Sequence, residues 1–226
     1  MSRRVALKVA VWVLCLAPLA LLLSRAATGN LSANPISFVT TWLGDWTLRL
    51  LLASLAMTPL RILFGLSWPL ALRRLLGLFA FFYAGLHFSV WLVVDHFFDW
   101  REMGADIVKR PYITVGMTAL TLMLPLAATS TTAAIKKLGG RNWQRLHRLA
   151  YAIGICGVLH YLWLAKKANP DPYYYATGLA LLLVIRAGHW GRRRVARLRA
   201  SASLPSADRT TLATLSPQGR GQRQGR

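Results

Sequence analysis

Six apolar runs, each close to the length of a membrane-spanning helix, dominate this sequence. About 20 apolar residues in a helix are enough to cross the hydrocarbon core of a bilayer. Arg, Lys, Pro or Gly bound the runs, which cover residues 5–23, 40–60, 74–94, 112–129, 147–165 and 173–189. The sequence therefore predicts an all-α fold, a polytopic membrane helix bundle with about six transmembrane helices.

The composition agrees with this prediction. Of the 226 residues, 55% are hydrophobic and only 15% are charged, which is unusual for a soluble domain. The first run has the basic start and small-residue exit of a secretory signal, but its apolar stretch exceeds the roughly 7 to 15 residues typical of a cleaved one. We interpret it as the first span.

Basic residues predict the orientation, because Lys and Arg are retained on the cytoplasmic side during insertion. With the N-terminus inside, the inner segments hold most of the basic residues. The outer segments hold few of them and carry Asp95, Asp99, Glu102, Asp106 and Asp171. We therefore expect both termini to be cytoplasmic, with residues 1–39 as the first helix and an outer loop, residues 40–190 as the transmembrane core and residues 191–226 as a disordered basic tail.

The net charge of +21 needs no nucleic-acid partner. In a membrane protein, such a surplus is explained by topology and by attraction to anionic lipid of the inner leaflet. The two cysteines, Cys15 and Cys156, lie inside apolar runs without the spacing of a metal site, and we interpret them as small buried hydrophobes.

Ionisable residues inside a bilayer are costly and usually functional, so the depth of each histidine matters. His87 lies thirteen residues beyond Arg74, and His160 lies thirteen beyond His147. Both therefore reach about 20 Å from the cytoplasmic side at the helical rise per residue. His147 stays at the inner surface.

Two imidazoles at one depth, among apolar and aromatic residues, suit the two axial positions of a haem held in a helix bundle. Gly85, Gly154 and Gly157 lie near these histidines and would leave room for the edge of the ring. The alternative is a pair of histidines that hydrogen-bond across helices, and spacing alone leaves it open.

His147 is a less certain ligand. A separation of thirteen residues turns a regular helix by about 220°, so His147 and His160 share a face only if the helix bends, as Gly154 and Gly157 would permit. A partner at the inner end of the third run would have to come from Arg73 or Arg74, which we interpret as topology and lipid contacts. We predict that His147 ligates a second haem, with a contact to an electron donor or an interfacial hydrogen bond as alternatives.

Three strings carry a family resemblance. "LRRLLGLFAFFYAGLHFSVWLVVDH", "KRPYITVGMTALTLMLPLAATS" and "NWQRLHRLAYAIGICGVLHYLW" closely resemble the MsrQ (YedZ) family, the haem-binding membrane subunits of the bacterial protein-methionine-sulfoxide reductase system. The resemblance covers about residues 40–190 and implies a ferric-reductase-like transmembrane core with one or two b-type haems. It places the family's haem histidines on His87, His147 and His160.

The resemblance also implies partners. The subunit would pass electrons across the inner (plasma) membrane to a periplasmic molybdenum-containing methionine-sulfoxide reductase subunit, without being that reductase itself. Its donor would be the quinone pool or a cytosolic flavin reductase. Flavin mononucleotide (FMN) rests on the resemblance alone, because the sequence holds no glycine-rich phosphate loop and no nucleotide-binding domain.

Other polar residues are assigned more simply. Arg49 lies in the second run, about 10 Å from the outer end of that run. It is a candidate partner of a haem propionate, and an i,i+4 ion pair with Asp45 is the alternative. His96 and His189 lie at run ends, where imidazole is easily solvated, and we interpret them as interfacial. The aromatic residues near run ends are interpreted as belt anchors: Trp42, Trp100, Tyr112, Trp163 and Tyr173.

Two rival functions remain at this point. A non-redox transporter or structural membrane protein predicts broken helix pairs, an internal repeat or a midplane acid, none of which the sequence shows. A stand-alone ferric or oxygen reductase would be followed by a cytosolic nucleotide-binding domain. We therefore favour an electron-transfer subunit, and we expect the outer loop around Asp99 and Glu102 to help dock its acceptor.

Overall fold

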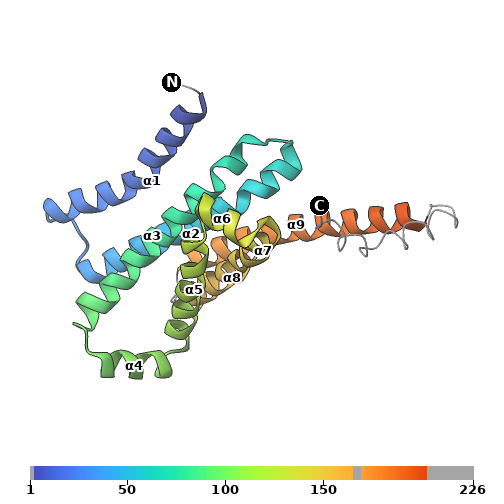
Figure 1. Cartoon of the computed structure of the whole chain (residues 1–226). Helices are drawn as coiled ribbons and strands as arrows, with labels where there is room; N and C mark the ends of the chain where they lie inside the picture. The colour runs from blue at the N-terminus through green and yellow to red at the C-terminus, as the bar shows by residue number, and fades with distance from the viewer. Residues whose placement is uncertain (1–2, 165–168, 203–226) are drawn as a thin grey trace, which may run out of the picture. The chain divides into compact units, whose positions relative to one another are not determined.

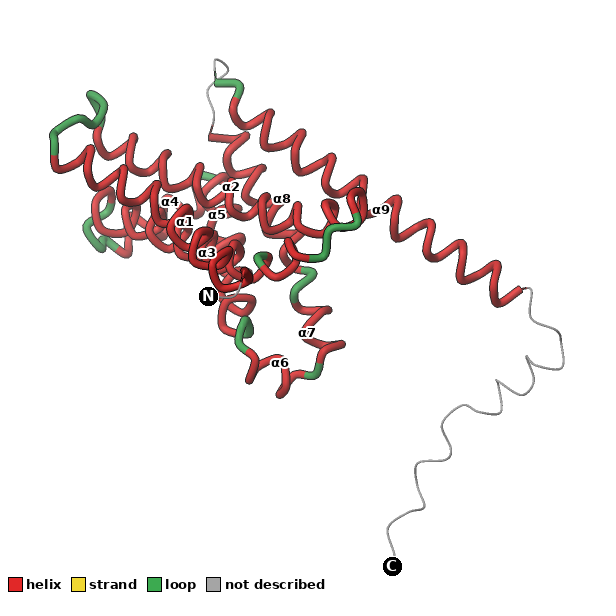
Figure 2. The backbone as a smooth tube through the Cα atoms, turned by 90° about the horizontal axis from the view of Figure 1, so that it is seen from above, coloured by secondary structure: helices red, strands yellow, loops and turns green. Residues whose placement is uncertain are grey.

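The structure is a computed structural model that describes residues 3–164 and 169–202. The described part of the chain consists of helices joined by loops and turns, and it contains no strand (Figures 1 and 2). The long helices are α1 (Arg3–Ala27), α2 (Pro35–Phe64), α3 (Arg73–Val90), α5 (Pro111–Ala128), α8 (Leu149–Leu164) and α9 (Asp171–Ala202). Shorter ones are η1 (Trp68–Ala71), the π-helical turn η2 (Trp91–Asp95), α4 (Trp100–Lys109), α6 (Thr132–Leu138) and α7 (Gly140–Leu146).

The six apolar runs coincide with the six long helices, and the all-α membrane bundle is confirmed. By length and hydropathy, four described segments could each cross a membrane: Val5–Ala27, Pro35–Phe64, Arg73–Asp95 and Pro111–Ala128. Helix α8 is apolar but has only 16 residues. The number of crossings thus stays a prediction.

Local sequence explains the ends of α2. Asn34 is the N-cap, and its side-chain oxygen accepts a hydrogen bond from Ser37 N at 3.1 Å, while Pro35 occupies the first turn, where no amide donor is needed. Gly65 ends the helix with φ of 68°, a left-handed conformation that glycine adopts without steric cost.

Two helix pairs form the core of the first unit, which covers residues 1–183. Helix α2 packs along α3, helix α5 packs against α8, and α2 also contacts α8 (Figure 1). The α2–α8 contact is close, since a Cβ on Gly157 would lie 3.0 Å from Leu48 Cδ2 and one on Gly154 would lie 3.2 Å from Leu55 Cδ1. Small residues allow this approach, as is common between membrane helices.

Helix α1 is joined to the core through α3. The buried Tyr83 donates a hydrogen bond from its hydroxyl to the Cys15 carbonyl oxygen at 2.8 Å. Cys15 is buried and Cys156 is half-buried, and both are free thiols. This agrees with a packing role for Cys15.

The irregularity between His147 and His160 that would be needed for a shared face does not lie at the glycines. The helix runs unbroken through Gly154 and Gly157, whereas a turn at His147 and Arg148 separates α7 from α8. The tail also differs from the expectation of disorder: residues 191–202 are the last part of α9, because Arg, Ala and Leu are strong helix formers. Residues 203–226 lie outside the described residues, and a second unit begins at Val184.

Candidate functional site

The structure brings His87 of α3 and His160 of α8 together. Their ring centroids lie 6.2 Å apart, with the ring planes at 86°. Both line a cavity of about 580 Å³, which we call the histidine-pair cavity. This volume is within the range of about 300 to 1,000 Å³ that holds small molecules and cofactors.

Each histidine is oriented by a backbone carbonyl. Nδ1 of His87 lies 2.9 Å from the Thr40 carbonyl oxygen, and Nδ1 of His160 lies 2.6 Å from that of Tyr112. A carbonyl oxygen only accepts, so each Nδ1 must carry the hydrogen and each Nε2 keeps its lone pair. This is the tautomer that a metal-binding imidazole needs, with the second-shell hydrogen bond that holds the ring in place.

The separation of the two rings fits one metal atom between them. Metal–imidazole bonds of about 2 Å on each side, plus about 1 Å from each ring nitrogen to its centroid, put the centroids about 6 Å apart. Among the described residues, no group of three or more His, Cys, Asp or Glu side chains could hold a metal ion alone. Two axial imidazoles are sufficient when a porphyrin supplies the other ligands, so the site fits a haem.

Glycines provide the space around the imidazoles, but they are not all the ones expected. A Cβ on Gly116 would lie 2.8 Å from Nδ1 of His160, and one on Gly44 would lie 3.3 Å from Cε1 of His87. Of the three predicted glycines, only Gly157 lines the cavity; Gly154 serves helix packing and Gly85 has open space. Gly44 and Gly116 were missed because they belong to other helices than the histidines.

One end of the histidine-pair cavity is polar. His96 is only 8% exposed and its ring lies 4.6 Å from that of Trp91, so the expectation that it is solvated is wrong. The π-helical turn η2 and the left-handed Phe97 and Phe98, with φ of 44° and 62°, turn the chain here and place His96 on the cavity. The lining at this end comprises Asp95, His96, Glu102, Asp106, Arg110 and Tyr112.

Arg49 is not among the residues that line the cavity. Its Nε donates to the Tyr175 hydroxyl at 2.9 Å, its Nη2 lies 3.9 Å from Asp45, and its guanidinium lies 5.0 Å from the Trp46 ring centroid. The structure therefore contains the alternative, the ion pair with Asp45.

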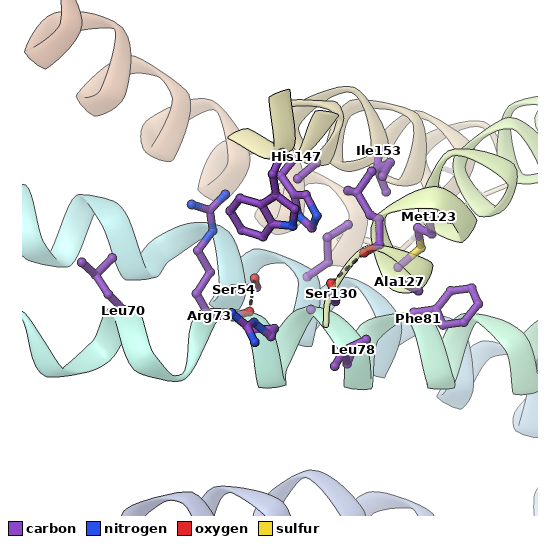
Figure 3. Close-up of a pocket in the computed structure, with 16 residues that line it drawn as sticks. Ser54, Leu70, Arg73, Leu78, Phe81, Met123, Ala127, Ser130, His147 and Ile153 are labelled. Atoms are coloured by element: carbon purple, nitrogen blue, oxygen red, sulfur yellow. Dashed lines mark hydrogen bonds between the residues drawn. The ribbon is translucent and has the colours of Figure 1, made fainter. Parts of the chain in front are cut away.

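His147 lines a second cavity of about 280 Å³ together with Arg73 and Arg74 (Figure 3), which we call the arginine cavity. Ser54 of α2 also lines it and donates a hydrogen bond to the Arg73 carbonyl oxygen at 2.9 Å. The sequence alone indicates topology and lipid contacts for these two arginines. The structure places them beside a histidine and a cavity.

The imidazole of His147 is held differently from the other two. It stacks on Trp143 at 3.9 Å between centroids, and its Nε2 lies 3.1 Å from Thr129 Oγ1. The Thr129 hydroxyl donates its only hydrogen to the Pro125 carbonyl oxygen at 2.6 Å, so it must accept from His147 Nε2.

The two cavities share a wall. Leu51, Met123 and Ile153 line both of them. All three are buried in the core. One layer of side chains therefore separates the His147 side of the bundle from the His87 and His160 side.

Comparisons with known proteins show the family of this chain. The sequence profile of the family described as "Ferric reductase like transmembrane component" matches residues 43–158. The chain is 49% identical to the protein-methionine-sulfoxide reductase heme-binding subunit MsrQ of Ralstonia nicotianae, over 87% of this chain and 91% of that protein. It is 50% identical to the MsrQ of Rhodospirillum rubrum, over 83% and 90% of the two chains.

Proposed function

Because the chain belongs to the ferric-reductase-like transmembrane family and, within it, to the MsrQ haem-binding subunits, we propose that it is the haem b subunit of a methionine-sulfoxide reductase system. It passes electrons across the bacterial inner membrane to a periplasmic, molybdenum-containing reductase subunit, which repairs oxidised proteins. The chain itself carries electrons and does not reduce methionine sulfoxide.

The observation that carries this proposal is the pair of His87 and His160. Neither Nε2 has a hydrogen-bond partner among the described residues, the Nδ1 hydrogens are bound to carbonyl oxygens, and the ring spacing fits one iron atom. Haem iron supplies the redox chemistry by cycling between the ferric and ferrous states. The residues around it hold the porphyrin, exclude water and set the potential through ligation and burial.

The arginine cavity is the entry point of the electron on the cytoplasmic side. His147 is our candidate ligand of a second haem, in which case Nε2 must exchange its hydrogen bond to Thr129 for iron. The donor is the quinone pool or a cytosolic flavin reductase, and FMN is a further candidate cofactor. The shared wall of Leu51, Met123 and Ile153 supports this route, because groups in the two cavities would be one side-chain layer apart.

The orientation follows from the basic residues, which put both termini in the cytoplasm. The arginine cavity is then inner and the polar end of the histidine-pair cavity is outer. Residues 40–190 form the haem-binding core, and the basic segment from residue 191 contacts anionic lipid. No nucleic-acid partner is needed.

Spectroscopy on the assembled system tests the proposal. Membranes that contain the chain are reduced, and the purified periplasmic reductase is then added with a methionine-sulfoxide-containing protein. We expect the ferrous haem bands to disappear as the substrate is reduced, and to persist when reductase or substrate is omitted. Bands that persist with both present would contradict electron delivery to this acceptor.

The acceptor docks against the outer helix α4, and a substitution at Glu102 tests this docking surface. Asp99 is a poor choice, because its carboxylate caps α4 through the amides of Arg101 and Glu102. We expect Glu102→Lys to slow reoxidation of the haem severalfold at low ionic strength, and the difference to vanish at high salt. The measurement is the rate of reoxidation against salt concentration.

Arg101→Glu is the matched control, since it changes charge by the same amount in the opposite sense on the same helix. It should leave the rate unchanged or raise it. Equal rates for wild type and Glu102→Lys at every ionic strength would exclude this docking surface.

A further inference from the structure

Three residues from three segments meet at the polar end of the histidine-pair cavity. His96 follows η2, Asp106 lies in α4, and Arg110 is the N-cap of α5. Asp106 joins the other two, with Oδ2 at 3.3 Å from His96 Nε2 and Oδ1 at 3.4 Å from Arg110 Nε. The side chain of Asp106 is 15% exposed and that of His96 is 8% exposed. The two side chains that hold Arg110 in place are therefore mostly buried.

The charges around this cavity make Arg110 distinctive. Among the described residues that line it, the carboxylates are Asp45, Asp95, Glu102 and Asp106, and Arg110 is the only Lys or Arg. A porphyrin of the b type carries two propionate carboxylates. Four lining carboxylates would repel them, and a planar guanidinium is the side chain best matched to a carboxylate.

Arg110 also has the capacity for another carboxylate. Its Nε faces Asp106, and its Nη1 lies 3.4 Å from the Tyr112 hydroxyl. Its Nη2 donates no hydrogen bond to any described residue. Because the side chain is 54% exposed, the guanidinium lies at the edge of the cavity, where the propionates of a haem ring meet the surface.

We propose that Arg110, held by the His96–Asp106 pair, binds a propionate of the haem ligated by His87 and His160, and thereby fixes the rotation of the porphyrin in the cavity. This inference rests on the proposed haem-binding function. Arg110 and Tyr112 belong to one segment, and the Tyr112 carbonyl orients His160. The start of α5 therefore positions both an axial ligand and the propionate. Arg49, the residue expected from the sequence, lies outside the lining.

The test is a titration of haem-depleted, full-length protein in detergent with iron protoporphyrin IX and with its dimethyl ester, which lacks the propionate charges. The wild type should bind the acid form about tenfold or more tightly than the ester, the range of a charge-assisted hydrogen bond. Arg110→Gln should weaken binding of the acid form alone and so abolish the preference. Its holoprotein should also have a lower midpoint potential, because a positive charge near the reduced haem has been removed.

Two variants are the controls. Lys109→Gln removes the same charge from the neighbouring residue, which does not line the cavity, and should keep the preference. Arg49→Gln should keep it too. If Arg110→Gln retains the preference, or Arg49→Gln abolishes it, Arg110 is not the propionate partner. If the wild type binds neither porphyrin, the haem-binding function itself fails.

Discussion

Replacement of His87 or His160 by alanine is expected to remove the low-spin b-type haem bands of the histidine-pair cavity. In the proposed site each imidazole would supply one nitrogen to the iron, and loss of a second-shell partner alone typically costs 10- to 100-fold in metal affinity. We therefore expect the haem of this cavity to fall by about 100-fold or more in either variant. Visible absorption spectra and pyridine-haemochrome quantification on purified, detergent-solubilised protein measure this.

His147→Ala separates the two cavities in the same experiment. A fractional loss of haem would show that a second haem is held on the His147 side, and no loss would leave that histidine with its hydrogen bond to Thr129. His189→Ala is the control for removing a histidine elsewhere. A colourless wild type, after expression with adequate haem supply, would refute the electron-transfer function.

Gly116→Ala is also expected to lower the haem content strongly, although glycine has no ligand atom. The new Cβ would lie 3.0 Å from Cε1 of His160 and 2.8 Å from its Nδ1, and the second distance is shorter than real Cβ atoms show. The imidazole must then move and lose its 2.6 Å contact with the Tyr112 carbonyl oxygen. We expect at least about a tenfold loss of haem, the effect of a lost second-shell bond.

Helix propensity makes the glycine test specific. Replacing a glycine inside a helix by alanine otherwise stabilises the helix by about 0.5 to 1 kcal/mol, so a general loss of structure is not expected. Gly85→Ala is the matched control: it lies two residues before His87, has open space at its Cβ and should keep full haem content. Gly44→Ala should be intermediate, because its Cβ would lie 3.3 Å from His87 Cε1.

Thermal unfolding followed by circular dichroism distinguishes the outcomes. If Gly116→Ala binds haem normally, the imidazole of His160 is not held by the contact seen here. If both Gly116→Ala and Gly85→Ala lose haem and unfold at lower temperature, helix packing and not the orientation of His160 is responsible.

The depth of the histidines could be predicted from the sequence. A membrane helix rises by a fixed amount per residue, so equal separations from the inner ends of two runs place His87 and His160 at one level. The structure brings these two rings within 6.2 Å of each other. The same count of residues places His147 at the cytoplasmic end of its run, and in the structure it lines a separate cavity.

The neighbours of the histidines could not be predicted in this way. Thr40 and Tyr112, whose carbonyls orient the imidazoles, are 47 and 48 residues away from them in sequence. The choice of Gly116 over Gly85 likewise depends on which helix faces which. Such contacts depend on the rotation of each helix about its axis and on the crossing angles, which hydropathy does not encode.

The polar residues show the same difference between what the sequence predicts and what tertiary packing decides. The sequence singled out Arg49 as a propionate partner, but Arg49 binds Tyr175, whereas Arg110, which the sequence did not single out, lines the cavity. His96 looked solvated because it ends a run, yet the π-helical turn before it places it against Asp106. Hydropathy and helical rise act along one chain segment, so the sequence by itself determined the long apolar helices and the equal level of His87 and His160. Only tertiary packing decided which side chains from separate helices share a cavity, because helix rotation and crossing are set by contacts distant in the sequence.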